Sequence, residues 1–236
     1  MIQKPKGTYD LYGDSAKKYK KLEEILTTLM EKYNYNYIKT PLFEASELFH
    51  RGVGETSDIV SKETYDFVDR GNRNMTLRPE GTAGVIRSFI ENKMYADTQP
   101  TKLYYITPCF RYERPQAGRQ RQFHQFGIEV LGSDGPSVDA EVISLAVQFF
   151  NEMGLKNLSV NINSVGCPTC REEYNRKLKE YLDKKVDVLC ETCLERKDKN
   201  PMRVIDCKNP HCKENLQDIP FMIDHLCEDC KDHFDK

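Results

Sequence analysis

The sequence predicts an α+β fold in which an antiparallel sheet is flanked by helices and followed by a small helical module rich in cysteine. Two segments near the middle, 103–114 and 122–131, are aromatic and β-branched, and they predict a pair of strands. Apolar residues recur at helical spacing before and after this pair. Eight of the nine cysteines follow residue 166. We therefore expect two domains, 1–166 and 167–236.

Composition argues against a strongly basic nucleic-acid-binding protein, a membrane protein and a secreted protein. The net charge of −2 gives no global attraction to nucleic acid, so any RNA contact must come from a local patch. No apolar run approaches the length of a membrane span, and residues 1–7 lack the apolar core of a signal peptide. Six cysteines fall in C-x-x-C pairs, which without a secretory signal indicate metal or redox use before disulfides.

The first third of the chain is predicted to alternate helix and strand. Apolar residues recur every three or four positions at Leu22, Ile25, Leu26, Leu29, Met30 and Tyr33, which predicts a helix. A strand over 37–42 and a loop over 52–58 are expected to follow it.

A second hairpin is predicted beyond that loop. Strands over 64–69 and 74–78 flank the turn 70–73, and a helix runs from Thr82 through Ile90. Glu80 therefore lies at a strand-to-helix junction, which is a usual position for a ligand-binding group.

The central hairpin carries an unusual amount of charge for strands. Because side chains alternate between faces, Arg111 and Glu113 are expected to share one face of its first strand. Phe123, Gln125 and Glu129 are expected to share one face of its second strand. The opposite face of that strand, with Phe126, Ile128 and Val130, is predicted to enter the core. A half-solvated polar face is the alternative interpretation of the charged residues.

The remaining elements are a helix over 138–153 that stops at Gly154 and a strand over 158–163. From Cys167 the composition changes to Cys- and Lys-rich with little β pattern. One helix there is marked by Tyr174, Leu178, Tyr181 and Leu182.

Several strings of residues resemble one family. The sequence Phe110-Arg111-Tyr112-Glu113-Arg114, then Gly118-Arg119, then Arg121-Gln122-Phe123-His124-Gln125, resembles motif 2 of the class II aminoacyl-tRNA synthetases in its histidyl-tRNA synthetase form. The order of long helix, strand and Pro41 resembles motif 1, and Leu77–Thr82 resembles the amino-acid-binding segment. The resemblance covers almost the whole chain. It implies a class II catalytic core with an antiparallel sheet over 1–166 and an insertion module over 167–236.

The resemblance also implies a reaction, histidine–tRNA ligation, and a role for each matching residue. Arg111 is expected to be catalytic, because it would hold the α-phosphate of ATP where charge accumulates. The ATP-binding set is Arg111, Glu113, Arg119 and Phe123, and ATP is expected with Mg²⁺. The histidine-binding set is Glu80, Gly81, Thr82, Arg111, Gln125 and Glu129.

Partners and location follow from the same resemblance. We expect L-histidine, ATP and tRNA(His) as partners, a homodimer formed through Asp14–Leu42, a cytoplasmic location and no membrane contact. Members of the family continue to an Arg-Gly-x-Asp-Tyr-Tyr segment, motif 3 and an anticodon-binding domain, and none of these precedes Lys236. The 236 residues are thus expected to be an N-terminal fragment that is catalytically incomplete.

Two other functions remain as alternatives. A non-catalytic, synthetase-like regulatory subunit of histidine biosynthesis would share the fold, but it would not need Glu113, Arg119 and Phe123 for a nucleotide. A nucleic-acid-binding zinc ribbon would use a local patch at Lys177, Lys179, Lys184 and Lys185, although these lysines also fit a solvated helix face.

The cysteines predict structural zinc. Cys₄ sites use the C-x-x-C spacing, and a small module with few large apolar residues gains folding energy from a metal. The candidate ligands are Cys167, Cys170, Cys190, Cys193, Cys207, Cys212, Cys227 and Cys230. They suit one or two sites, and the sequence leaves their pairing open. A set of reduced thiols is the alternative. Cys109, in the central hairpin, is excluded from the sites.

Overall fold

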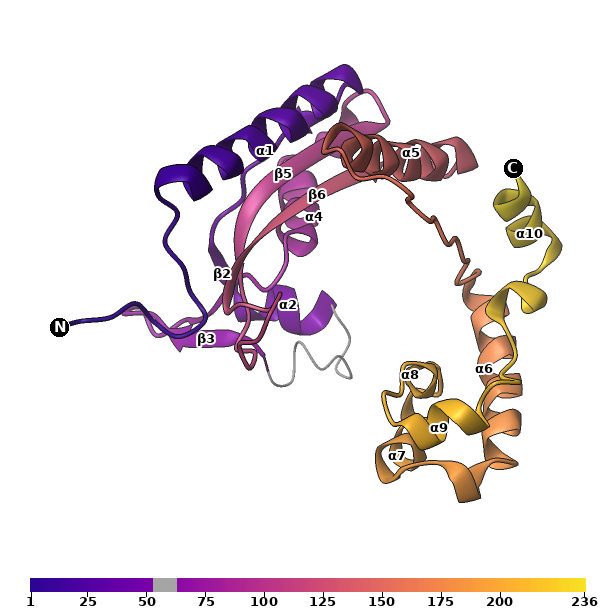
Figure 1. Ribbon diagram of the computed structural model, residues 1–236. Coiled ribbons are helices and arrows are strands. Elements are labelled where there is room, and N and C mark those ends of the chain that lie inside the picture. The colour runs from indigo at the N-terminus through magenta and orange to yellow at the C-terminus, as the bar shows by residue number, and fades with distance from the viewer. Residues whose placement is uncertain (53–62) are drawn as a thin grey trace. The chain divides into compact units, whose positions relative to one another are not determined.

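The computed structural model describes residues 1–52 and 63–236 of the chain, so most of the predicted loop 52–58 lies outside the described residues (Figure 1). The described chain forms two compact units. The first comprises 1–134 and 138–156, and the second comprises 135–137 and 157–236. Within the described ranges, no helix combines the length and the apolar character that a membrane crossing requires.

The central hairpin forms the first sheet. Strands β5 (Thr101–Phe110) and β6 (Gln122–Leu131) pair antiparallel from Thr101↔Leu131 to Phe110↔Gln122. A short strand, β1 (Asn36–Tyr37), runs parallel to β5 and gives the order β1-β5-β6.

The first strand of this hairpin ends earlier than predicted. Arg111 still donates its backbone N–H to the carbonyl of Arg121, at 2.9 Å, but Tyr112 donates to the carbonyl of Glu63, at 2.7 Å. The chain separates from β6 after Arg111 because the backbone N–H of Tyr112 bonds to Glu63 instead of to β6. Arg111 and Glu113 therefore lie beyond the end of β5, and the prediction that they share a strand face is wrong.

The second sheet has the order β2-β4-β3 and is antiparallel throughout. Its strands are β2 (Phe43–Ala45), β3 (Tyr65–Val68) and β4 (Asn74–Leu77). The hairpin predicted over 64–78 is confirmed, whereas the strand predicted over 37–42 is wrong. The chain instead forms β1 and β2 on either side of an irregular stretch that contains Pro41, which has no N–H to donate to a sheet.

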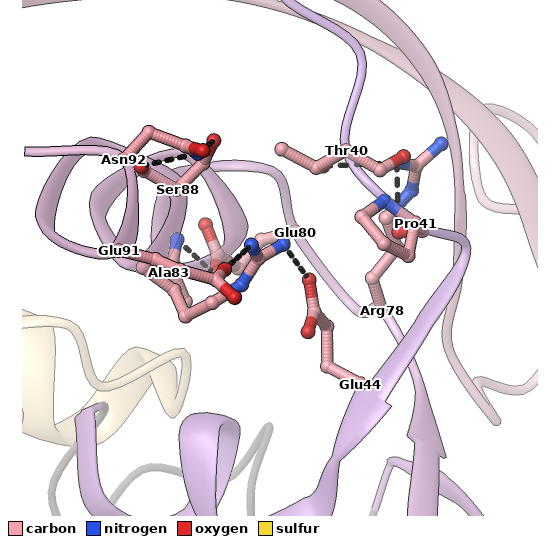
Figure 2. Close-up of polar contacts among 10 residues, drawn as sticks. Thr40, Pro41, Glu44, Arg78, Glu80, Ala83, Ser88, Glu91 and Asn92 are labelled. Carbon is pink, nitrogen blue, oxygen red and sulfur yellow. Dashed lines mark hydrogen bonds and ion pairs between the residues drawn. The ribbon is translucent and has the colours of Figure 1, made fainter. Parts of the chain in front are cut away.

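A buried arginine explains that irregular stretch. Arg78 is only 2% exposed. Its Nη1 donates to the carbonyls of Thr40 (3.0 Å) and Pro41 (3.2 Å), and its Nε donates to the carbonyl of Pro108 (2.8 Å). Figure 2 shows Arg78 beside Thr40 and Pro41. The carbonyls of Thr40 and Pro41 thus accept from a side chain instead of from a neighbouring strand.

Helices cover both faces of the β5–β6 hairpin. Helix α1 (Gly13–Lys32) and helix α5 (Pro136–Glu152) share a core with the hairpin face predicted to be apolar. That core contains Leu29, Met30, Tyr35, Tyr104 and Leu145, packed against Phe126, Ile128 and Val130. Helix α4 (Thr82–Glu91) places Val85 against Leu103 and Tyr105, which belong to the opposite face of β5. The short helices α2 (Ser46–Gly52) and η1 (Met94–Ala96) are the other helices in the described part of the first unit.

The second unit is helical, as predicted. Its helices are α6 (Pro168–Asp183), η2 (Val186–Val188), α7 (Glu191–Lys199), α8 (Met202–Ile205), α9 (Pro210–Asn215), η3 (Met222–His225) and α10 (Glu228–Asp235). Tyr174, Leu178 and Leu182 form the buried face of α6. The strand predicted over 158–163 is wrong, because the segment has no neighbouring strand among the described residues and its apolar side chains are exposed.

We expect Arg78→Lys to lower the free energy of unfolding by about 3 kcal/mol. A lysine keeps the charge, but one ammonium group cannot reach the carbonyls of Thr40, Pro41 and Pro108 together, so buried acceptors lose their donors. Urea denaturation measures the effect, with Arg73→Lys, in the exposed β3–β4 turn, as the matched control. A loss for Arg78→Lys no larger than that of the control would contradict the role given to Arg78.

Candidate active site

The turn between β4 and α4 is organised by Glu80. Its carboxylate accepts the backbone N–H of Thr82 at 2.5 Å and that of Ala83 at 2.9 Å, and thereby satisfies two of the free N–H groups at the start of helix α4. Figure 2 shows Glu80 beside Ala83. The predicted position of Glu80 at a strand-to-helix junction is confirmed. Because both backbone bonds hold the side chain, its carboxylate has a fixed place at the start of the helix.

Gln125 joins this turn to the central hairpin. Its Oε1 accepts the backbone N–H of Gly81 at 2.9 Å. On β6, Gln125 lies opposite Thr107, and strand alternation places it on the same face as Phe123 and Glu129. The structure therefore brings Glu80, Gly81 and Gln125 together, although 44 residues separate Gly81 from Gln125.

Tyr105, which was not among the residues predicted from the sequence, fills the space between the turn and β6. A Cβ on Gly81 or on Gly127 would come within 2.2 Å of the Tyr105 ring, so both positions require glycine. The Tyr105 hydroxyl donates to Oε1 of Glu129 at 3.4 Å. Burial raises the pKa of Tyr105 to about 12, which keeps the phenol protonated as a donor. Gly127, a glycine inside a strand, is the signal that could have revealed this close approach.

Glu129 is a half-buried carboxylate beside a second one. Burial is the largest influence and raises its pKa, and the charge of Glu80 acts in the same direction. Hydrogen bonds with Thr82 and Tyr105 lower the pKa in part. Two neighbouring carboxylates favour a ligand that brings a positive charge or N–H donors. Glu80, Thr82, Tyr105 and Glu129 form what we call the acidic end of the site.

A cationic end lies where β5 gives way to the loop. The Nε of Arg111 donates to the carbonyl of Pro79 at 2.9 Å, and its guanidinium lies over the Phe123 ring, 5.1 Å from the centroid. Glu113 accepts from Nη1 of Arg119 at 3.3 Å and lies 4.0 Å from Nη1 of Arg111. All four predicted nucleotide-binding residues are therefore neighbours. The Arg111–Pro79 bond connects them to the turn that contains Glu80.

The residues before α1, which include Gly7, form a polar lead-in that supports the loop between β5 and β6. The carbonyl of Gly7 accepts the backbone N–H of Arg121 (2.8 Å) and of Gln122 (3.1 Å). Gly7 has φ +82°, and a Cβ there would come within 2.8 Å of the Arg121 side chain. Arg121 in turn lies over the Tyr112 ring, 4.0 Å from the centroid, and its Nε donates to the carbonyl of Glu113. The lead-in thus helps to place both ends of the loop.

The eight cysteines of the second unit gather in two groups of four. We call Cys167, Cys170, Cys227 and Cys230 the first tetrad, and Cys190, Cys193, Cys207 and Cys212 the second tetrad. Within each tetrad every Sγ atom lies within 4.8 Å of the other three. Cys109 is buried in β5 and belongs to neither tetrad.

Comparisons with known proteins assign the chain to a family. A sequence model described as histidyl-tRNA synthetase matches residues 7–200. The chain belongs to the histidyl-tRNA synthetase family. It is 66% identical over 236 residues to the histidine–tRNA ligase of Clostridioides difficile strain 630, and 56% identical over 233 residues to that of Desulfitobacterium hafniense strain Y51. The alignments cover 100% and 99% of this chain but 56% and 55% of the relatives, so the chain spans a little over half their length.

Solved structures of the histidyl-tRNA synthetase family agree with the described fold. The apo histidyl-tRNA synthetase of Staphylococcus aureus matches with a TM-score of 0.76 and 39% identity, over 100% of this chain and 53% of that chain. A Bacillus halodurans protein described as an ATP phosphoribosyltransferase regulatory subunit/histidyl-tRNA synthetase shares the fold, with a TM-score of 0.65 and 23% identity over 98% of this chain and 62% of that chain. The predicted family and fold class are confirmed.

We expect Glu129→Gln to raise the midpoint of thermal unfolding at neutral pH in the absence of ligand. Burial raises the pKa of Glu129 in the folded chain, so the ionised carboxylate destabilises the folded state at pH values above that pKa. As the pH falls through the raised pKa, the folded protein takes up the proton first and the penalty disappears. The gain from glutamine should therefore shrink in acid.

Calorimetric melts from neutral pH to pH values near the ordinary glutamate pKa measure this gain. Glu31→Gln, on the exposed side of α1, is the matched control and should leave the midpoint almost unchanged. A lower midpoint for Glu129→Gln at neutral pH would show that the carboxylate stabilises the ligand-free fold.

Proposed function

We propose that this chain takes part in ATP-dependent histidine–tRNA ligation, the activity for which its relatives are named. In the first step, a carboxylate oxygen of histidine attacks the α-phosphate of ATP, which forms histidyl-adenylate and releases pyrophosphate. In the second step, the histidyl group passes to the terminal adenosine of tRNA(His) and AMP leaves. One observation carries the proposal: a single turn and hairpin join an acidic end to a cationic end through the bond from Arg111 to the carbonyl of Pro79.

The acidic end fits histidine. Glu129 accepts an imidazole N–H, while Tyr105 holds the carboxylate from the other side through its neutral hydroxyl. Glu80 and Thr82, with Gln125, surround the α-ammonium, and Gly81 lets the chain pass close to the Tyr105 ring. A side chain without an N–H donor would leave the half-buried carboxylate of Glu129 with the protein's own donors alone, among them the Tyr105 hydroxyl. Selection of histidine then rests on the acceptor capacity of Glu129 that the protein does not fill.

The cationic end fits a nucleotide. Arg111 holds the α-phosphate, because its Nε bond to Pro79 fixes the guanidinium near the turn that holds histidine. Arg119 is 53% exposed at its side chain and pairs with the nearly buried Glu113 in the ligand-free chain. The terminal phosphates of ATP, accompanied by Mg²⁺, draw Arg119 away. Glu113 is then released to accept from the adenine amino group, while the ring stacks on Phe123.

The residues of the cationic end favour a synthetase over a regulatory subunit. A protein that only senses histidine needs the acidic end alone. Here Glu113, Arg119 and Phe123 are assembled around Arg111 as well, and their side chains suit a nucleotide. The likeness to the Bacillus halodurans protein concerns the fold and does not alter this preference.

The proposal includes assembly and location. We assign the dimer contact to Asp14–Leu42, where Tyr37 and Leu42 are exposed and Phe43 follows, also exposed. The protein acts in the cytoplasm, with residues 1–166 as its catalytic core. The 236 residues supply one part of the active site, and segments that the longer relatives carry complete it.

ATP–pyrophosphate exchange tests these roles in a protein of full family length. We expect Arg111→Ala to lower kcat by about 10²–10³, since the guanidinium stabilises charge that develops in the transition state. We expect Glu129→Ala to raise the KM for histidine by about 10- to 100-fold, since it removes a charged hydrogen-bond acceptor of the ground state.

The exchange experiment needs two comparisons. Arg73→Ala, in the exposed β3–β4 turn, should leave both constants unchanged. The 236-residue chain alone should exchange far more slowly than the full-length protein. Equal effects of Arg111→Ala and Glu129→Ala on the KM for histidine would contradict the two roles. Exchange by the chain alone within about tenfold of the full-length rate would contradict the shared site.

A further inference from the structure

The second unit holds two tetrads whose pairing the sequence left open. The first tetrad joins the pair at the start of α6 to the pair at the start of α10. The second joins the pair at the start of α7 to Cys207, which follows α8, and to Cys212, in α9. We propose that each tetrad binds one structural Zn²⁺ ion, so that the unit carries two ions with four thiolate ligands each.

The sulfur positions suit a single ion in each tetrad. Four thiolates at about 2.3 Å from a tetrahedral Zn²⁺ lie about 3.8 Å from one another. The Sγ atoms of Cys167 and Cys170 are 3.5 Å apart, and those of Cys190 and Cys207 are 3.8 Å apart. An iron–sulfur cluster would hold its thiolates farther apart, because several iron and sulfide atoms would lie between them. All nine cysteines lie in the described ranges and are free, so disulfides do not account for the grouping.

Backbone groups surround the sulfurs as they do in thiolate sites. The N–H of Cys227 donates to Sγ of Cys170 at 3.1 Å, which links the two pairs of the first tetrad. In the second tetrad, the N–H of Cys190 donates to Sγ of Cys212 at 3.2 Å, and the N–H of Asn209 donates to Sγ of Cys207 at 3.4 Å. Such bonds spread the negative charge of metal-bound thiolates and orient the ligands.

The dipoles of three helices also favour negatively charged thiolates at these positions. Cys167, Cys190 and Cys227 are the N-cap residues of α6, α7 and α10, and the second cysteine of each pair lies in the first turn of its helix. The positive end of each helix dipole thus faces thiolates. A Zn²⁺ ion with four thiolates keeps a net charge of −2, which these helix ends help to stabilise.

The core of the unit shows why an ion would be needed. Cysteines form a large part of its buried cluster, where Cys170, Cys193, Cys207 and Cys212 pack together with Tyr174, Leu178 and Leu182. Thiols contribute little apolar area, and a module this small has a limited core. The ion in the first tetrad ties the first helix of the unit to the last one, and the ion in the second tetrad fixes the short helices between them.

Elemental analysis of the unaltered 236-residue chain, purified without chelator, tests the proposal. We expect two equivalents of zinc, a zinc-edge X-ray absorption spectrum of four sulfur ligands, and loss of helical circular dichroism when a strong chelator removes the metal. Replacement with Co²⁺ should give the thiolate-to-metal bands of tetrahedral Cys₄ coordination. Less than a tenth of an equivalent of zinc, iron in place of zinc, or eight freely titrating thiols in the folded chain would overturn it.

Variants test the pairing. Cys227→Ser with Cys230→Ser should remove one ion and keep the other, and Cys207→Ser with Cys212→Ser should do the same for the other tetrad. The quadruple variant should bind no zinc tightly. If Cys167 and Cys170 paired with Cys190 and Cys193 instead, the quadruple variant would keep one ion, which would overturn the assignment. Cys109→Ser should retain both ions, and if any variant fails to fold, the zinc count and sulfur coordination of the unaltered chain still decide the proposal.

Discussion

The buried guanidinium of Arg78 is the interaction on which the first unit depends. It binds the carbonyls of Thr40 and Pro41, between β1 and β2, and the carbonyl of Pro108, in β5. The backbone N–H of Arg78 donates to the carbonyl of Leu42, and the carbonyl of Arg78 accepts the backbone N–H of Phe110. The two sheets therefore meet at one residue. That residue directly precedes the turn that carries Glu80, so the position of the turn against the hairpin is set by hydrogen bonds in the interior.

The site built on that frame is polarised along its length. Glu80 and Glu129 form an acidic end around Tyr105, and Arg111 and Arg119 form a cationic end around Glu113 and Phe123. In the ligand-free chain these groups interact with the protein itself. Arg119 pairs with Glu113, and Arg111 lies over the Phe123 ring. Burial disfavours the charged form of Glu129 and raises its pKa. In the function proposed above, the imidazole N–H of histidine pairs with Glu129, and the phosphates of ATP pair with Arg111 and Arg119.

The elements set by local pattern were predictable, and those set by distant partners were not. Period-two alternation placed Phe126, Ile128 and Val130 in the core, and turn chemistry located the β3–β4 hairpin. The strand predicted over 37–42 failed because Arg78 takes its carbonyls, and the one over 158–163 failed because no described strand pairs with it. The resemblance supplied Glu80, Gln125 and the cationic residues. Tyr105 occupies the space that Gly81 and Gly127 leave, and in the sequence only Gly127, as a glycine inside a strand, pointed to that close approach. The cysteine spacing identified the candidate ligands of the proposed ions but not their grouping, since pairs far apart in sequence meet through helix packing.

The most direct test of this account is a crystal structure of the protein bound to a sulfamoyl analogue of histidyl-adenylate. We expect the imidazole to lie against Glu129 and the α-ammonium to lie among Glu80, Thr82 and Gln125. We expect Arg111 to contact the sulfamoyl group, which stands in for the α-phosphate. Arg78 should keep its bonds to Thr40, Pro41 and Pro108, because the frame exists before the ligand binds. An analogue bound with its imidazole away from Glu129, or an Arg78 that changes its partners on binding, would contradict the account.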